Sequence, residues 1–387
     1  MQSRGCFVRT PVLRLMAASV KDILSCLDAA YPFSWAVPED RVGLQVGDPG
    51  APVTTVLVAL EASQEVVTEA HNQEAQLLLT HHPLLYQPAA DIREDRPAGQ
   101  LLASLVRAGI AVASCHTNLD LAPKGMNEHL AQELGFLDLE VLLPVRRDAW
   151  FKLTVFVPVG YEDQVRAALV DDRVGVIGRY SHCSFAARGQ GTYLPLEGAR
   201  PFRGEVAALS RAEESRLEVV VPESCVAPAL ARLKAAHPYE EVAYDLYPLA
   251  DSGPILGFGR VGSWPQALSW EEVVNRVKAV FAVSGVRVWG RPPAAVSRVA
   301  VCGGSGGELI GPAIQKGAEV YVTGEVRHHQ AVPYPSEGFA IIEVGHFASE
   351  VVFMPAWAEQ VAGLLQEEGL EVQVRAAIAE KPPFQVI

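Results

Sequence analysis

Short apolar runs alternate with amphipathic segments along the first third of the chain. The runs Val53–Leu60, Gln76–Leu79 and Ile110–Ser114 predict strands that are buried on both faces of a sheet. Around them, apolar residues recur three or four positions apart and predict helices over residues 19–30, from Ser63, over 97–107 and over 127–134. Strands that alternate with helices at this spacing predict a βαβ architecture around a largely parallel sheet.

The pattern changes near Leu143-Pro144 and changes back after Ser252-Gly253-Pro254. Between these points the order is β-α-β…β-α-β, which over about 100 residues predicts a ferredoxin-like α+β unit. The longer alternation then resumes, with strands predicted at 296–302, 320–323, 339–344 and 370–374 and helices at 269–281 and about 350–368. We therefore expect an α/β core of two similar halves, residues 17–145 and 250–387, with residues 146–249 as an inserted domain.

The composition narrows the function classes. The chain has 387 residues and a formal net charge of −13, which argues against a protein that binds nucleic acid through a broadly basic surface. Free nucleotides remain plausible substrates, because a bound metal ion supplies local positive charge. No apolar stretch approaches the roughly 20 residues that span a bilayer. The six cysteines are scattered and form no Cys-x-x-Cys pair, which is typical of reduced thiols in a cytoplasmic protein.

The first fifteen residues contain three arginines and no acidic residue, and Met16 follows them. This segment is either a targeting peptide or the product of an upstream start codon. We favour the second interpretation and expect residues 1–16 to form a disordered extension.

Potential metal ligands follow three of the apolar runs. They are His81 and His82 after the second run, His116 and Asp120 after the third, and His346 and Glu350 after the strand at 339–344. The ends of strands are where open α/β sheets bind ligands, so these side chains form a metal site if the strand ends converge. Imidazole and carboxylate groups together suit zinc, iron, manganese or cobalt.

The spacing of these residues suggests separate roles. Adjacent side chains diverge, so His81 and His82 suit two neighbouring ions, one each. His346 and Glu350 are four apart and share a helical face, and Glu350 has two oxygens with which to bridge two ions. His116 is either a ligand or a hydrogen-bonding neighbour of one. The alternatives are a surface loop for the histidine pair, an Asx turn at Asp120 and acidic capping of a helix by Glu350.

Three further motifs are open to more than one interpretation. Glu325, His328 and His329 follow another strand and are candidates for proton transfer, substrate contact or support of the ligands, or else form a polar helix start. The glycine-rich stretch Gly303–Gly307 either cradles phosphate or makes a tight turn into a helix. The cluster His237–Glu241 either binds an ion or only ends a helix and packs its tyrosine.

The order of the motifs resembles one known family. Its strings are Val42-Gly43-Leu44-Gln45-Val46-Gly47, His81-His82-Pro83, His116-Thr117-Asn118-Leu119-Asp120, Cys302-Gly303-Gly304-Ser305-Gly306, Thr323-Gly324-Glu325 and Gly345-His346-Phe347-Ala348-Ser349-Glu350. Together they resemble the Nif-three-like proteins, also called GTP cyclohydrolase I type 2 homologues. The inserted domain resembles the PII/CutA-like domain of the longer bacterial members, through the strings Gly175-Val176-Ile177-Gly178-Arg179-Tyr180, Cys183-Ser184-Phe185 and His237-Pro238-Tyr239-Glu240-Glu241. One departure is Arg41, where the family commonly has asparagine.

The resemblance implies a ring-shaped homohexamer, built as a trimer of dimers, with a dinuclear site of two divalent ions per chain. The ligands implied are His81, His82, Asp120, His346 and Glu350, with Glu350 bridging. The activity implied is hydrolytic opening of the guanine ring of GTP with release of formate, on a small-molecule substrate and away from membranes. A metal-dependent phosphoesterase, or a metal-binding scaffold or regulator without catalysis, are the alternatives that the same residues allow.

Overall fold

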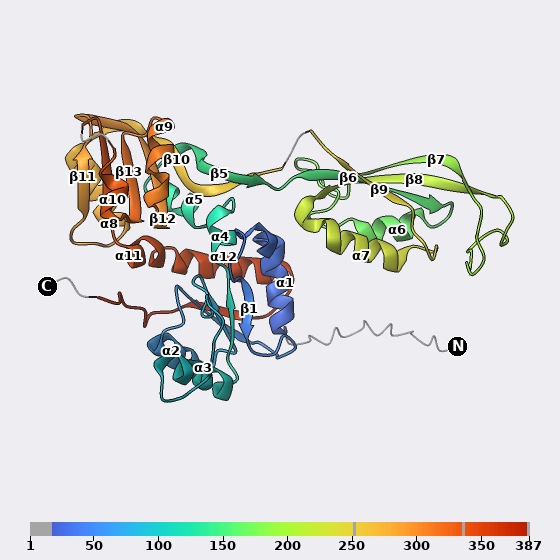
Figure 1. Cartoon of the computed structure of the whole chain (residues 1–387), viewed down its shortest axis with the longest axis horizontal. Helices are drawn as coiled ribbons and strands as arrows, with labels where there is room; N and C mark the ends of the chain where they lie inside the picture. The colour runs from blue at the N-terminus through green and yellow to red at the C-terminus, as the bar shows by residue number, and fades with distance from the viewer. Residues whose placement is uncertain (1–17, 251–252, 335–336, 385–387) are drawn as a thin grey trace, which may run out of the picture. The chain divides into compact units, whose positions relative to one another are not determined.

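The structure is a computed structural model that describes residues 18–250, 253–334 and 337–384 (Figure 1). It divides into two compact units. The core unit contains the residues up to Asp120, Lys124–Leu139 and the residues from Arg260 on, and the inserted unit contains Leu121–Pro123 and Glu140–Gly259. The inserted unit therefore extends several residues beyond the expected range of 146–249 on both sides. The expected extension, residues 1–16, lies outside the described residues.

The first sheet of the core unit has five strands, and all neighbouring pairs except the one with β1 are parallel, as predicted. In order across the sheet the strands are β1 (Gly43–Val46), β4 (Ala111–Ser114), β3 (Leu77–Thr80), β2 (Thr55–Ala59) and β15 (Gln373–Ala376). Every residue of β2, β3 and β4 is buried. Burial on both faces explains why these strands are continuous apolar runs in the sequence.

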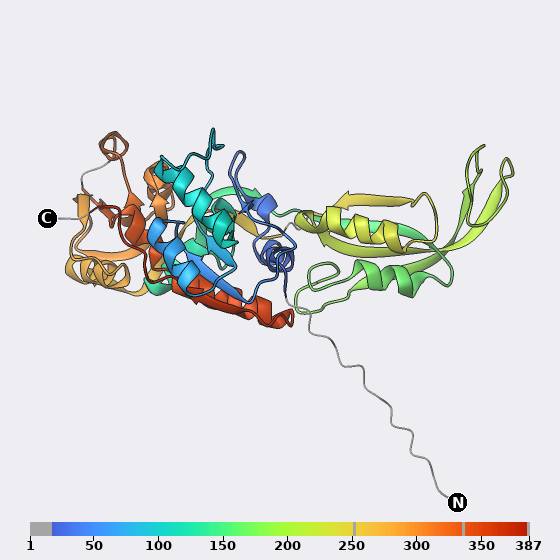
Figure 2. The ribbon, with the colours of Figure 1, turned by 90° about the horizontal axis from the view of Figure 1, so that it is seen from below.

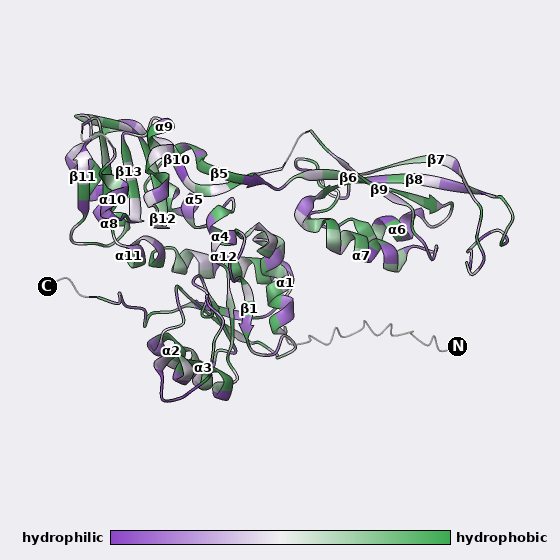
Figure 3. Ribbon diagram, in the orientation of Figure 1, coloured by the Kyte–Doolittle hydropathy of each residue, from purple (hydrophilic) through white to green (hydrophobic). Residues whose placement is uncertain are grey.

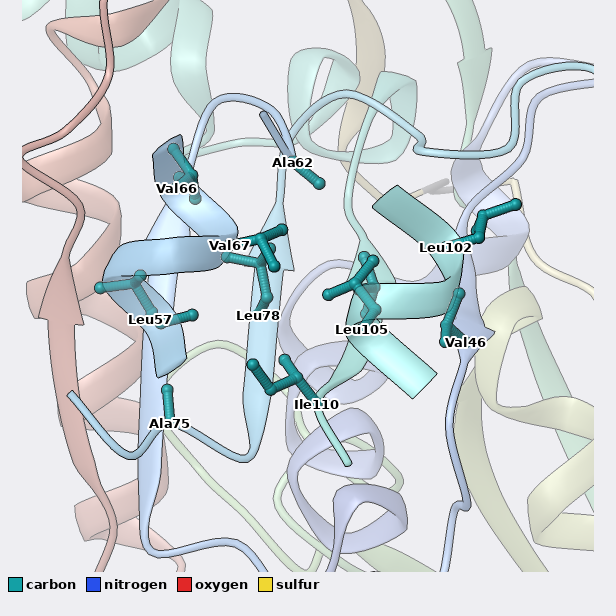
Figure 4. Packing of buried hydrophobic residues seen from close by; sticks show 13 residues of the cluster. Val46, Leu57, Ala62, Val66, Val67, Ala75, Leu78, Leu102, Leu105 and Ile110 are labelled. Carbon is teal, nitrogen blue, oxygen red and sulfur yellow. The ribbon is translucent and has the colours of Figure 1, made fainter. Parts of the chain in front are cut away.

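Helices cover both faces of this sheet. On one face, α2 (Gln64–Asn72) and α3 (Pro97–Ala108) contribute Val66 and Leu105 to an apolar cluster with Leu57 and Leu78 of the sheet (Figure 4). On the other face, α12 (Met354–Glu367) contacts β2 and β15, and α1 (Val20–Ala30) packs on α12. Ser19 caps α1 in a reciprocal pair of hydrogen bonds with Asp22.

The second sheet of the core unit is mixed rather than parallel throughout. In order across it the strands are β11 (Arg287–Arg291), β14 (Phe339–Glu343), β13 (Val320–Glu325), β12 (Ala295–Ser305), β10 (Ile255–Ser269) and β5 (Leu137–Arg147). The central strands β12, β13 and β14 are parallel, and β10 and β11 join them in the antiparallel sense. Every residue of β13 except Glu325 is buried, and Figure 3 shows the hydropathy of the sheet residue by residue. The helices α5 (Met126–Glu133) and α8 (Trp270–Val280) contact β12.

The two halves of the core are not independent, because the end of the chain completes the first sheet. Strand β15 pairs with β2, and the strand lies three residues later than the expected start at 370. The single helix expected at about 350–368 is two helices, α11 (His346–Val351) and α12. The break has a local cause, because Pro355 lies in the first turn of α12 and has no N–H to donate to the preceding turn.

The inserted unit contains a four-stranded antiparallel sheet in the order β7-β8-β6-β9. Along the chain its elements are β6 (Trp150–Pro158), α6 (Glu162–Leu169), β7 (Ser184–Tyr193), β8 (Ser210–Pro222), α7 (Val226–Ala236) and β9 (Tyr244–Pro248). Both helices pack against the sheet through one apolar cluster that includes Val165, Leu233 and Val155 (Figures 1 and 2). The element order is the β-α-β-β-α-β order expected, while a relation to PII or CutA proteins stays a prediction.

The predictions on membrane-spanning segments and on cysteines can be compared with all the described residues. Within them, no helix is long and apolar enough to cross a membrane. The cysteines that the structure describes are all free thiols, and three of them are buried.

Gly363 offers a test of the packing of α12. It lies inside the helix, and a methyl group added there would meet no atom within 4 Å. Since alanine is about 1 kcal/mol more favourable than glycine in a helix interior, we expect Gly363→Ala to stabilise the protein by up to about 1 kcal/mol. Thermal unfolding of the variant beside the parent protein measures this. A lowered melting temperature would contradict the open environment of this face of α12.

Candidate metal centre

Three strand ends of the core unit bring their polar side chains to one place. His81 and His82 follow β3, Asp120 lies in the short helix α4 (Thr117–Leu121) after β4, and α11 after β14 carries His346 and Glu350. The ring centroids of His82 and His346, which come from different sheets, are 5.5 Å apart. The expected convergence at the carboxyl ends of parallel strands therefore appears in the structure.

Each oxygen of the Glu350 carboxylate lies near a different group of potential metal-ligand atoms. Its Oε1 lies 3.9 Å from His81 Nε2, which is 3.6 Å from Asp120 Oδ1. Its Oε2 lies 3.0 Å from His82 Nε2 and 3.2 Å from His346 Nε2. In a tetrahedral site with metal–nitrogen bonds of 2.0–2.1 Å the ligand atoms are separated by about 3.3 Å, so these spacings suit coordination of a transition ion.

The Nδ1 atom of each imidazole faces an acceptor, which leaves Nε2 directed at the cluster. The acceptors are the Cys115 carbonyl for His81 at 2.9 Å, Glu61 for His82 at 3.8 Å, Glu325 for His346 at 3.2 Å and Asp40 for His116 at 2.9 Å. A carbonyl acceptor fixes the proton of His81 on Nδ1, so its Nε2 carries a lone pair. Acceptors behind histidines in this arrangement orient metal ligands in proteins.

The electrostatics of the cluster also fit a cation. Burial lowers the pKa of His81 to about 3, so this imidazole is neutral and able to coordinate. Burial raises the pKa of Asp120 to about 7, and the nearby Glu350 carboxylate adds to the effect. Burial acts in the same direction on Glu350, but the imidazoles of His346 and His82 outweigh it and hold its pKa below the usual range. His81 Nε2 and Glu350 Oε2 are buried atoms that have no hydrogen-bond partner among the described residues. The residues present therefore fit a metal site.

The glycine-rich stretch Gly303–Gly307 makes room for Glu350 rather than for phosphate. A Cβ on Gly304 would lie 2.4 Å from Glu350 Oε1. The backbone N–H of Gly303 donates to Asn127, that of Gly304 to Ser349, and that of Gly306 to the Glu325 carbonyl. With three of the five amides bonded inside the protein, the stretch fits the tight-turn interpretation better than a phosphate cradle. The helix that follows is short, η3 (Gly307–Leu309) and then α9 (Ile310–Gln315).

His116 lies beside the ligands and is held by Asp40. Its ring centroid is 5.2 Å from that of His81 and 5.8 Å from that of His82. Asp40 also accepts hydrogen bonds from the backbone N–H and the hydroxyl of Thr117, which fix its carboxylate. Asp40 and Glu61 were not foreseen from the sequence, because nothing near them in the chain marks them as partners of histidines. The neighbouring Arg41 is exposed, and its backbone N–H bonds to Asp40.

The three residues predicted for proton transfer are placed differently. Glu325 ends β13 and contacts His346 Nδ1, so it orients a candidate ligand. His328 and His329 are exposed on α10 (His328–Ala331). Within the described residues, no hydrogen bond, ion pair or ring contact joins either imidazole to the histidine cluster. A catalytic role for these two histidines stays a prediction.

Comparison with known proteins gives consistent matches along almost the whole chain. Residues 18–383 match the family described as Duf34/NIF3 (NGG1p interacting factor 3). A protein of Bacillus subtilis named GTP cyclohydrolase 1 type 2 homolog is 40% identical, over 95% of this chain and 99% of its own. A Mycobacterium tuberculosis protein of the same name is 37% identical, over 96% of this chain and 98% of its own.

Solved structures match as well. The structure of a Bacillus cereus protein related to NIF3 superposes with a TM-score of 0.81 at 36% identity, covering 96% of this chain and 100% of the other. That of Staphylococcus aureus protein SA1388 gives a TM-score of 0.71 at 26% identity, covering 96% and 99%.

Gly304→Ala tests the space that Glu350 needs. The new methyl group would displace the Glu350 carboxylate, so we expect a loss of metal affinity of about ten-fold or more. Metal content after dialysis against a graded chelator measures the loss. Gly109→Ala is the matched control, because its φ of +67° is close to the +64° of Gly304 but a Cβ there meets nothing within 4 Å. Equal metal content in the two variants would contradict the close packing of Gly304 on Glu350.

Proposed function

The chain belongs to the Duf34/NIF3 family, and on this premise we propose that it is a metal-dependent hydrolase with a site for two divalent ions. One observation carries the proposal. The two oxygens of the buried Glu350 face different donors, His81 with Asp120 on one side and His82 with His346 on the other. When bound, a pair of divalent ions about 3.5–4 Å apart generates a nucleophile from water at neutral pH and polarises the substrate.

The chemistry of the proposed ligand atoms limits which metal ions the site favours. Imidazole nitrogen and carboxylate oxygen suit zinc, iron, manganese and cobalt, whereas calcium and magnesium prefer oxygen ligands alone. Three of the five proposed ligands are histidines. We therefore expect a transition ion rather than magnesium in the protein as it is purified.

His116 is our candidate for proton transfer. The Asp40 carboxylate accepts from Nδ1, so Nε2 is the atom that faces the cluster and can take or give a proton. Burial opposes the charged form of His116, but the Asp40 and Asp120 carboxylates outweigh burial and raise its pKa. A histidine oriented by a buried carboxylate is a common general acid or base.

GTP is the substrate that we propose, with hydrolytic opening of the guanine imidazole ring and formate as a product. The support is the name of the relatives, GTP cyclohydrolase 1 type 2 homolog. The chain itself has a net charge of −13, so the polyanionic substrate needs positive charge at the site. A pair of bound divalent ions supplies such a charge.

The direct test combines metal analysis with an assay for formate. We expect about two ions per chain after reconstitution, and formate from GTP at a rate that depends on those ions. His116→Ala is expected to keep the metal and to lower turnover by about 10²- to 10⁴-fold, because only the proton-transfer group is lost. His71→Ala, an exposed histidine on α2, is the matched control and should leave both values unchanged.

Two results would count against the proposal in different ways. Fewer than about 1.5 ions per chain would contradict the two-ion site. Two ions per chain with no formate, in the parent protein and in the control, would contradict GTP hydrolysis and favour a phosphoesterase or a scaffold without catalysis.

We also propose, from the family resemblance, that the protein assembles as a homohexamer built from three dimers. The chain has a mass of 41.7 kDa, so light scattering on the eluted protein should give about six times this value. A mass of one or two chains at micromolar concentration would contradict the hexamer.

A further inference from the structure

The inserted unit contains a cavity of about 550 Å³ that has no part in the metal site. It lies between the end of β7, the segment after it and the residues that follow α7. Its aromatic lining residues are Phe156, Tyr193, Phe202 and Tyr239. Tyr239 is close to two of the other rings, with centroid distances of 5.9 Å to Phe202 and 6.5 Å to Tyr193. Rings grouped in this way present their faces and edges to a shared space.

The charged groups that line this cavity are all acidic. They are Glu214, Glu240 and Glu241, and the lining includes no lysine, arginine or histidine. Glu214 comes from β8 and is only 8% exposed. Glu240 is partly exposed at the edge, where it accepts a hydrogen bond from the Arg200 backbone and forms an ion pair with the Arg200 side chain at 3.7 Å. Of the described lining residues, Glu214 and Glu241 therefore carry the unpaired charge. The cavity therefore combines an aromatic lining with negative charge.

Glu214 is held in place but is not neutralised. Its Oε1 accepts a hydrogen bond of 2.9 Å from the Tyr239 hydroxyl, and a Cβ on Gly191 would lie 2.1 Å from its Oε2. Gly191 thus leaves the space that the carboxylate occupies, which is a common reason for glycine inside a strand. Among the described residues no ion pair to Glu214 is present. Its negative charge therefore lines the cavity without a cationic partner, and a cation bound there would pair with it.

His237, a candidate ion ligand from the sequence, has another role. Its Nε2 lies 3.1 Å from the Phe156 carbonyl, and its Nδ1 accepts a hydrogen bond from the Tyr239 backbone. Both ring nitrogens are therefore used within the protein. The histidine fixes Tyr239 against β6, so the cluster His237–Glu241 builds one wall of the cavity instead of an ion site.

We propose that this cavity binds a small organic ammonium ion with an apolar body. The cation would lie over the rings of Phe202 and Tyr239, near the Glu214 carboxylate, and the apolar body would fill the aromatic part of the cavity. Aromatic faces attract cations through the ring quadrupole, and groups of aromatic residues bind quaternary ammonium ions in this way. The Phe202 ring already attracts one cation, because the Arg203 guanidinium lies 5.7 Å from its centroid. Acidic lining disfavours phosphates, so a nucleotide is not the expected ligand.

The test uses charged probes beside neutral probes of the same shape, on the full-length protein. Choline is paired with 3,3-dimethylbutan-1-ol, and tyramine with tyrosol, so that quaternary and primary ammonium ions are both covered. Calorimetry and ligand-observed NMR measure binding up to about 10 mM. We expect at least one charged probe to bind about ten-fold or more tightly than its neutral partner.

Variants connect this preference to the cavity. Glu214→Gln keeps an acceptor for Tyr239 and removes the charge, so the preference for the charged probe should disappear. Phe202→Leu removes a half-exposed ring, so it should weaken the binding of the charged probe by about three-fold or more without affecting folding. Glu213→Gln is the matched control, because it removes the same charge from the adjacent, exposed position of β8 and should leave binding unchanged.

Three outcomes would overturn the proposal. The first is equal affinity for the charged and neutral probes. The second is a preference for the charged probe that persists in both Glu214→Gln and Phe202→Leu. The third is a parent protein that binds neither choline nor tyramine. If Glu214→Gln fails to fold, as circular dichroism would reveal, Phe202→Leu decides alone. The metal content of each variant should match the parent protein, since the cavity belongs to the inserted unit.

Discussion

The shared Glu350 carboxylate is the interaction on which the core unit depends. It is 5% exposed, and burying a charged carboxylate is costly unless other groups compensate for the lost water. Here the compensation comes from two imidazoles, that of His82, which follows a strand of the first sheet, and that of His346 on the same helix as Glu350. Glu350 lies between candidate ligands that follow strands of both sheets. The strand ends of the two sheets therefore have to stay together for the cluster to form.

Several features of the fold hold the Glu350 carboxylate in this position. The helix α11 begins at His346, so that His346 and Glu350 lie on the same helical face. Gly304 has no side chain where the carboxylate lies, and Ser349 is tied to the Gly304 backbone. After α12 the chain adds strand β15 to the first sheet, where it pairs with β2. The second half of the core is therefore hydrogen-bonded to the first half.

The sequence predicted the ligands better than their surroundings. Strand ends and helical spacing are local signals, so the apolar runs before His81 and His346 predicted that these candidate ligands come together, as they do in the structure. Asp40 could not be found in this way, because its partner His116 is 76 residues away in the sequence. The glycines at 303–307 were interpreted as a possible phosphate loop because the residue they accommodate, Glu350, is distant in the chain. The mixed second sheet was also missed, since the long strands β5 and β10 lie where the sequence pattern changes between units.

The most direct measurement is anomalous diffraction at the metal absorption edge from crystals of the reconstituted protein. We predict two anomalous peaks about 3.5–4 Å apart, one on each side of the Glu350 carboxylate, with His81 and Asp120 at one peak and His82 and His346 at the other. A single peak, or two peaks on the same oxygen of Glu350, would show that this carboxylate does not bridge two ions.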